Sequence, residues 1–166
     1  MKKLILGYLP KDYNPEKYIV LGPWSFIDNQ DLLINGAIFE DDPYNNHLEI
    51  KRDAELSIRI SNNLILLFAQ KLNKHNNTSY SNKYWRVMLS AWVSMLVQIT
   101  IERYRRIERL IHKYPTDKFK VDLVECNEDW FFNDSLDFVN KGVFDMLFNE
   151  WIFSFIIKES FSDQFE

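Results

Sequence analysis

The stretch Tyr80–Lys113, YSNKYWRVMLSAWVSMLVQITIERYRRIERLIHK, is long, mostly apolar and free of glycine and proline. Ser81 suits the N-terminal cap of a helix, because a serine hydroxyl accepts a hydrogen bond from an amide of the first turn. Pro115 disfavours helix beyond Lys113, since the residue before a proline avoids helical backbone angles. We therefore predict one helix over residues 81–113, roughly 48 Å long, which is enough to cross a whole domain.

The two halves of this stretch differ in character. Apolar residues occur on nearly every side from Trp85 to Ile101, which predicts a buried central helix. From Glu102 onward the sequence is amphipathic and basic, with Arg103, Arg105, Arg106, Arg109 and Lys113. Cations near a helix C-terminus complement its dipole, so the second half is interpreted as a solvated helix end.

The flanking sequence predicts a helix-rich α/β fold in a single domain over residues 1–166. Apolar runs near residues 3–9 and 17–21, and an alternating run near 119–125, predict three short strands. Helical periodicity predicts two further long helices, near residues 47–74 and 135–158. The polar linker between residues 73 and 78 is short, so the first two long helices are expected to be antiparallel neighbours.

The amino-acid composition argues against a nucleic-acid-binding protein and against a membrane-spanning protein. The chain is 46% hydrophobic and 16% aromatic, which is ample for a packed core. A formal net charge of -4 argues against nucleic acid as the main partner. The longest apolar run, Val87–Ile101, has 15 residues, whereas a membrane span needs about 20. With the single cysteine, Cys126, these features predict a cytoplasmic protein without a transmembrane segment.

Few patterns in the sequence point directly to chemistry. Glu40-Asp41-Asp42 is a weak candidate for a divalent cation and is more typical of a solvated turn. The three histidines are too scattered to predict a metal site, and no phosphate-binding loop or nucleophile elbow is present. No metal or cofactor is therefore predicted. The apolar run Trp151–Ile157 requires burial, which suggests packing against a further domain or a protein partner.

Several motifs occur in an order that resembles a known family. They are Leu21-Gly22-Pro23-Trp24, Leu72-Asn73-Lys74-His75, Tyr84-Trp85-Arg86, Glu102-Arg103-Tyr104 and Asn149-Glu150-Trp151. The chain thereby resembles the N-terminal part of a family of transferases from O-antigen and other surface-carbohydrate loci, with LGEW, YWR…GPW and DEW motifs. Pro23 replaces an acid of the family pattern, and Ser90-Ala91 replaces Gly-Pro.

The resemblance implies candidate roles for five residues. Arg86 and Arg103 would bind phosphate or carboxylate groups of a nucleotide-sugar donor, since guanidinium groups pair bidentately with such oxygens. Trp24 and Trp85 would stack on a sugar or base, and His75 would be the general base toward a carbohydrate acceptor. The alternative for these side chains is structural: Glu102 pairing with an arginine of its own helix, Arg86 with Glu150, and both tryptophans in the core.

Two hypotheses for function follow from the sequence. In the first, the chain is the N-terminal domain, or a truncated form, of a two-domain glycosyltransferase-like enzyme of surface-polysaccharide biosynthesis. Since such enzymes form their site between domains, we expect this chain alone to be inactive. In the second, it is a non-catalytic binding or scaffolding module that packs on a partner through its C-terminal helix.

Overall fold

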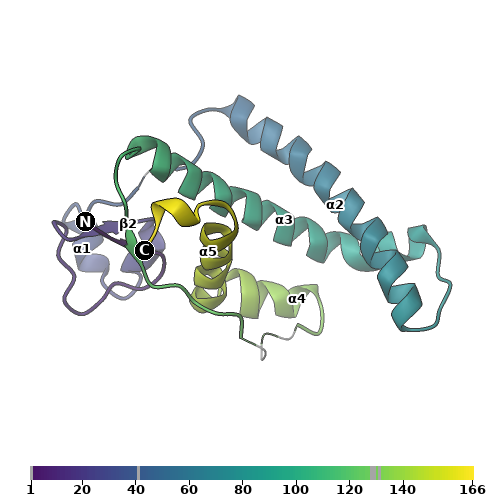
Figure 1. The fold of residues 1–166 in the computed structure, drawn as a ribbon. Helices are drawn as coiled ribbons and strands as arrows, with labels where there is room; N and C mark the ends of the chain where they lie inside the picture. The colour runs from purple at the N-terminus through teal and green to yellow at the C-terminus, as the bar shows by residue number, and fades with distance from the viewer. Residues whose placement is uncertain (1, 41, 128–129, 131) are drawn as a thin grey trace.

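The computed structural model of the chain describes residues 2–40, 42–127, 130 and 132–166. It is a helix-rich α/β fold, as predicted (Figure 1). The main elements are β1 (Lys3–Ile5), β2 (Tyr18–Val20), α1 (Gln30–Ile34), α2 (His47–His75), α3 (Asn82–Lys113), β3 (Lys120–Val121), α4 (Ser135–Phe138) and α5 (Met146–Ser160). Single-turn helices η1 (Pro23–Phe26) and η3 (Ser162–Gln164) and a π-helical turn η2 (Val139–Val143) complete the described elements.

Helices α2 and α3 form an antiparallel hairpin that extends away from the rest of the molecule (Figure 1). Both start at a side-chain cap: the Asn46 Oδ1 accepts from two amides of α2, and the Ser81 hydroxyl accepts from the Tyr84 amide. The buried positions of α2 recur every four residues and are mostly small, among them Ser57, Ser61 and Ala69. Small side chains let the two backbones approach closely along this line.

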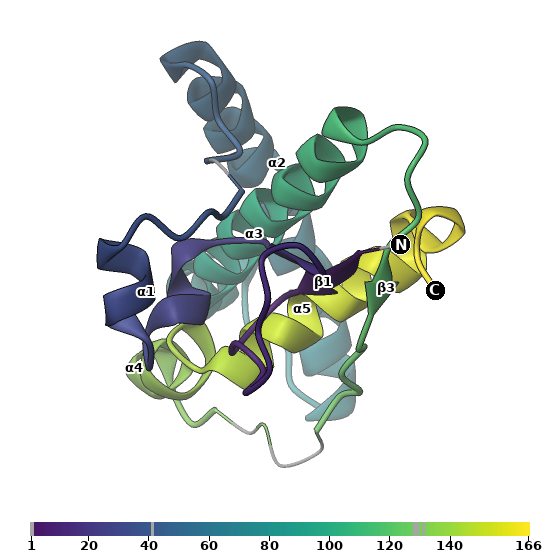
Figure 2. The same cartoon turned by 90° about the vertical axis from the view of Figure 1, so that its left-hand side faces the viewer.

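The sheet is small and fully parallel, with strand order β2-β1-β3. Alternate strand residues point to opposite faces, and both faces are covered. Leu4, Leu6, Ile19 and Leu21 join the main core with α3 and α5, while Ile5 and Val20 pack with Phe26 on the other face. Figure 2 shows α5 passing behind β1 and β3. The observed strands are shorter than the predicted ranges 3–9, 17–21 and 119–125.

The main core is formed by the second half of α3, which corrects the prediction from sequence. Ile107 and Leu110 are almost completely buried, and α5 contributes Phe153 and Ile157 to the same core. In the first half of α3, Val87 and Met88 are 76% and 57% exposed. The apolar first half was expected to be buried and the basic second half solvated. The first half is only partly buried, because Val93 and Val97 pack against α2 while Val87 and Met88 remain exposed. The second half is not a solvated end, because the sheet and α5 pack beside residues 103–111.

The predicted helix over residues 135–158 is interrupted. After α4 the chain makes the π-helical turn, leaves helical geometry at Phe144–Asp145 and begins α5, where the Asp145 carboxylate caps the new helix by accepting from the Phe148 amide at 2.7 Å. The apolar run Trp151–Ile157 lies on α5 and is mostly buried inside this chain, Phe155 being the exposed member. Its burial therefore needs no partner.

Candidate functional site

The strand order creates a switch point at the carboxyl end of the sheet. The chain leaves β1 to form β2 on one side and later returns to form β3 on the other, so the connections diverge beyond the ends of β1 and β3. Ligands of parallel α/β proteins bind at such a point. The segments that follow the strands here are Leu6-Gly7-Tyr8, Gly22-Pro23-Trp24 and Asp122.

Trp24 is held rigidly at this edge. Its indole Nε1 donates a 2.8 Å hydrogen bond to the Leu6 carbonyl just beyond β1. Its ring stacks on Phe153 of α5, with centroids 6.0 Å apart and planes 18° from parallel. The ring also covers Gly22, where any Cβ atom would overlap it, so glycine is required at the end of β2. The strand-end motif thus fixes one aromatic surface beside the central strand.

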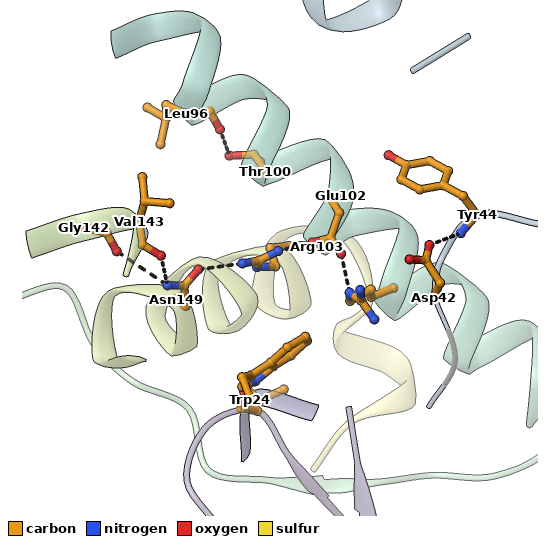
Figure 3. Close-up of polar contacts among 12 residues, drawn as sticks. Trp24, Asp42, Tyr44, Leu96, Thr100, Glu102, Arg103, Gly142, Val143 and Asn149 are labelled. Carbon is orange, nitrogen blue, oxygen red and sulfur yellow. Dashed lines mark hydrogen bonds and ion pairs between the residues drawn. The ribbon is translucent and has the colours of Figure 1, made fainter. Parts of the chain in front are cut away.

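Two arginines of α3 lie against this tryptophan. The guanidinium carbons of Arg103 and Arg106 are 5.6 and 5.0 Å from the Trp24 ring centroid, within cation–π range. Both arginines form ion pairs with Glu102, and Figure 3 shows the pair with Arg103. One carboxylate against two guanidinium groups leaves the cluster with one net positive charge in a largely buried position.

Asn149 joins this cluster to the start of α5. Its Oδ1 accepts from Arg103 Nη2 at 2.9 Å, while its Nδ2 donates to the carbonyls of Val143 and Asp145 at 2.8 and 2.7 Å (Figure 3). The Nε of Arg103 is buried and has no hydrogen-bond partner among the residues that the structure describes. Arg103 is therefore held by Glu102 and Asn149 through its Nη atoms, and its Nε is a donor without a partner among the described residues.

Glu150, the next residue on α5, brings a carboxylate to the end of β1. The carboxylate lies against Gly7, where a Cβ would overlap it, and accepts a hydrogen bond from the Tyr8 amide. Burial raises the pKa of Glu150, with a smaller contribution from the negative charges of Asp145 and Asp122. It lines a cavity of about 130 Å³ with Asp122, whose carboxylate pairs with Lys3. A half-buried carboxyl with a raised pKa at this edge is suited to accept a proton.

A second polar cluster connects α2 to α3 and is structural in character. Arg105 makes a bidentate ion pair with buried Asp53, at 2.8 and 2.9 Å, and a third bond to Glu108 at 2.7 Å. The Arg105 charge lowers the pKa of Asp53, whereas burial, followed by the effect of Asp53, raises the pKa of Tyr44 to about 12. The Arg105–Asp53 ion pair joins α2 to α3 directly and so holds the hairpin together, and these residues also line a cleft of about 420 Å³.

The structure brings together only two of the five residues that the sequence suggested. Trp24 and Arg103 meet at the carboxyl edge of the sheet, whereas His75, Trp85 and Arg86 lie at the far end of the α2–α3 hairpin. There the Trp85 Nε1 donates to Asn73 Oδ1 at 2.9 Å, and Arg86 and His75 are exposed.

Three residues of the edge were not among the predicted site residues. Asn149 and Glu150 belong to the motif Asn149-Glu150-Trp151, and this motif could have pointed to them as site residues. Arg106 belongs to the basic run of α3. Of the structural alternatives, the pairing of Glu102 within its own helix is confirmed. The pairing of Arg86 with Glu150 is absent from the ion pairs between described residues.

Neither a metal site nor a membrane-spanning helix is found among the residues that the structure describes. They contain no group of three or more His, Cys, Asp or Glu side chains arranged to hold a metal ion. None of the described helices combines the length and hydrophobicity needed to cross a membrane. Asp41 of the acidic cluster Glu40-Asp41-Asp42 lies outside the described residues.

The chain was compared with models of known protein families, with curated proteins and with solved structures. Residues 2–166 match the model of a family described as LIC12162 family transferase. No curated protein and no solved structure matches the chain.

Proposed function

The chain belongs to the LIC12162 family of transferases, and on this premise we propose that it is the N-terminal domain, or a truncated form, of a glycosyltransferase-like enzyme. We further propose that this enzyme acts in the cytoplasm, in the biosynthesis of surface polysaccharides such as O-antigen. The observation that supports this best is the grouping of Trp24, Arg103, Arg106 and Glu150 at the carboxyl edge of the sheet. This grouping offers an aromatic surface, a positive charge and a carboxylate in one place.

In this proposal the arginines bind the phosphates of a nucleotide-sugar donor. The cluster of Arg103, Arg106 and Glu102 has a net positive charge, and Arg103 has a buried Nε without a partner among the described residues. Guanidinium groups make strong, oriented hydrogen bonds to phosphate oxygens, more so where water is partly excluded. The Trp24 ring, fixed by its bond to the Leu6 carbonyl, provides a surface against which a sugar or base can stack.

The chemical step that this arrangement suits is attack by an acceptor hydroxyl on the anomeric carbon of the donor. The new C–O bond forms as the bond to the leaving phosphate breaks, and the hydroxyl proton passes to the Glu150 carboxylate. Arg103 stabilises the negative charge that develops on the leaving phosphate. His75, the base suggested by the sequence, is the alternative; it would require the acceptor to bind at the far end of the hairpin.

The size of the edge cavity supports the proposal that a further domain completes the site. The cavity beside Glu150 is about 130 Å³, whereas ligand sites for small molecules are roughly 300–1,000 Å³. Only part of a nucleotide-sugar would fit in this cavity. We therefore propose that these residues form one wall of the site and that they do not turn over substrate alone.

The second candidate function is a non-catalytic module that binds a partner through α5. Leu147 and Phe155 of this helix are 53% and 52% exposed, and Trp151 lies between them at four-residue spacing. Phe144, just before α5, is also exposed. Such a row of apolar side chains at helical spacing is typical of a surface that binds another protein.

Thermal unfolding of the purified chain with UDP-, GDP-, dTDP- and CMP-sugars tests the first proposal. A ligand at about 100 times its Kd adds about 2.7 kcal/mol to the free energy of unfolding, a shift of roughly 5–11 °C for a chain of this size. We expect a shift with one nucleotide class that is lost in folded Arg103→Met and kept in Arg59→Met, whose arginine is exposed on α2.

Two further outcomes decide between the alternatives. Loss of the shift in Arg86→Met instead of Arg103→Met would move the donor site to the hairpin end. The absence of a shift with any nucleotide class, from a folded sample, would contradict donor binding and favour the partner-binding module.

A further inference from the structure

The far half of the α2–α3 hairpin is basic in an otherwise acidic chain. Residues 60–101 contain Lys71, Lys74, Lys83 and Arg86 but no aspartate or glutamate, although the net charge of the chain is -4. We propose that this end of the hairpin, residues 63–91, binds the surface of a bilayer that contains anionic phospholipids. The proposal concerns the end of the molecule opposite the sheet and is independent of the proposed transferase site (Figure 1).

The positive charges of the hairpin end are available to an external partner. All four basic side chains are exposed. None of them forms an ion pair or side-chain hydrogen bond with any residue in the described part of the chain, in contrast to Arg103, Arg105 and Lys113. The surface of an anionic bilayer attracts each such Lys or Arg, and the attraction falls off within a Debye length.

Apolar and aromatic side chains are exposed among these charges. Val87 is 76% exposed and Met88 57%, and they are joined on the same hairpin end by Leu66, Leu67, Tyr80 and Tyr84. Tyr80 and Tyr84 stack with ring centroids 4.3 Å apart, and Trp85 packs edge-on against both. Tyrosine and tryptophan favour the headgroup region of a bilayer, while residues such as Val87 and Met88 enter the boundary of the acyl chains.

A groove of about 790 Å³ at the same end fits this interpretation. Its walls are mainly apolar and include Phe68, Met88, Trp92 and Phe132, while Lys71, His75 and Asp134 also line it. A groove with mainly apolar walls can accept part of an acyl chain, while the four exposed basic side chains attract the headgroups. Double-stranded nucleic acid would use the charges but not the exposed Val87 and Met88, so the combination favours a membrane surface over nucleic acid. Since no described helix can span a bilayer, the contact is peripheral.

Co-flotation of the purified chain with vesicles tests the proposal. We expect binding to vesicles that contain phosphatidylglycerol and not to vesicles of phosphatidylcholine alone, with release at high salt. Lys74→Gln combined with Lys83→Gln should weaken partitioning about thirtyfold, since each basic side chain near the surface contributes about fivefold. The matched control, Lys11→Gln with Lys17→Gln, removes two exposed lysines near the sheet and should bind as the unaltered chain does.

A second pair of variants separates lipid binding from simple charge attraction. Val87→Ser with Met88→Gln keeps every charge and changes only exposed positions, where substitutions have little effect on folding. Weaker vesicle binding by this pair would support insertion of the apolar side chains. The proposal would be overturned if anionic vesicles did not bind, if both lysine pairs had equal effects, or if a DNA duplex bound more tightly than the vesicles.

Discussion

Replacing Asn149 by alanine tests the connection between α3 and α5 most directly. Asn149 is 9% exposed, and its side chain bonds to Arg103 on α3 and to two backbone carbonyls that precede α5. The bonds to the Val143 and Asp145 carbonyls contribute about 1 kcal/mol each, and the bond to the charged Arg103 about 1.5–3 kcal/mol. Water replaces part of this in the variant, because the Arg103 side chain is 19% exposed. We expect a net loss of about 3 kcal/mol in the free energy of unfolding.

Urea denaturation of four variants measures this loss and assigns it. A loss of about 3 kcal/mol lowers the Tm by roughly 6–12 °C in a chain of this size. Asn63→Ala, at an exposed position of α2, is the matched control and should change stability by less than about 0.5 kcal/mol. Arg103→Met and the double variant complete a cycle in which Asn149→Ala should cost less once Arg103 is absent. Equal costs in both backgrounds, or a loss no larger than that of Asn63→Ala, would refute the connection.

Three further predictions concern charged groups and the strand end. Gly7→Ala should destabilise the fold because its Cβ would overlap the Glu150 carboxylate; urea titrations should show a much smaller cost when Glu150→Ser is also present. Burial raises the pKa of Glu150 above its ordinary 4.5, so the free energy of unfolding should fall as pH rises from 4.5 through the raised pKa. Unfolding measured as a function of pH should lack this fall in Glu150→Gln. Because Arg105 lowers the pKa of Asp53 below 3.8, the stability that it contributes is present at neutral pH and lost on acidification. Asp53→Asn should therefore be less stable than the unaltered chain at pH 7 and about equal to it in strong acid, by calorimetry.

The local elements were predictable because their signals are local. Ser81 and Pro115 bracket α3 as expected, since capping and the steric effect of proline act within a few residues. The interruption at Phe144–Asp145 had a sequence signal as well: Gly142 weakens a helix, and Asp145 is a good cap for a new one. Apolar periodicity across residues 135–158 concealed it, because α4 and α5 both direct apolar side chains to the same core.

The burial of α3 and the composition of the site depend on neighbours that one sequence does not specify. Val87 and Ile107 are both aliphatic residues of one helix, yet only Ile107 lies where α5 and the sheet pack. The resemblance to a transferase family singled out Trp24 and Arg103, which the structure places together. The position of Glu150 depends on its contact with Gly7, which lies just beyond the distant strand β1, and such a contact leaves no periodic pattern in the sequence.

The sheet combines a local strand pair with a distant one, and this has a consequence for the order of folding. Strands β1 and β2 are close in sequence, but Lys3 also pairs with Lys120, and Phe119 and Val121 share backbone hydrogen bonds with Glu166. Strand β3 can therefore join the sheet only after more than 100 residues beyond β1 have been synthesised. The α2–α3 hairpin joins neighbouring segments, and local contacts lose little chain entropy, so we expect it to form early. We expect the edge that holds Trp24 and Glu150 to form after the hairpin.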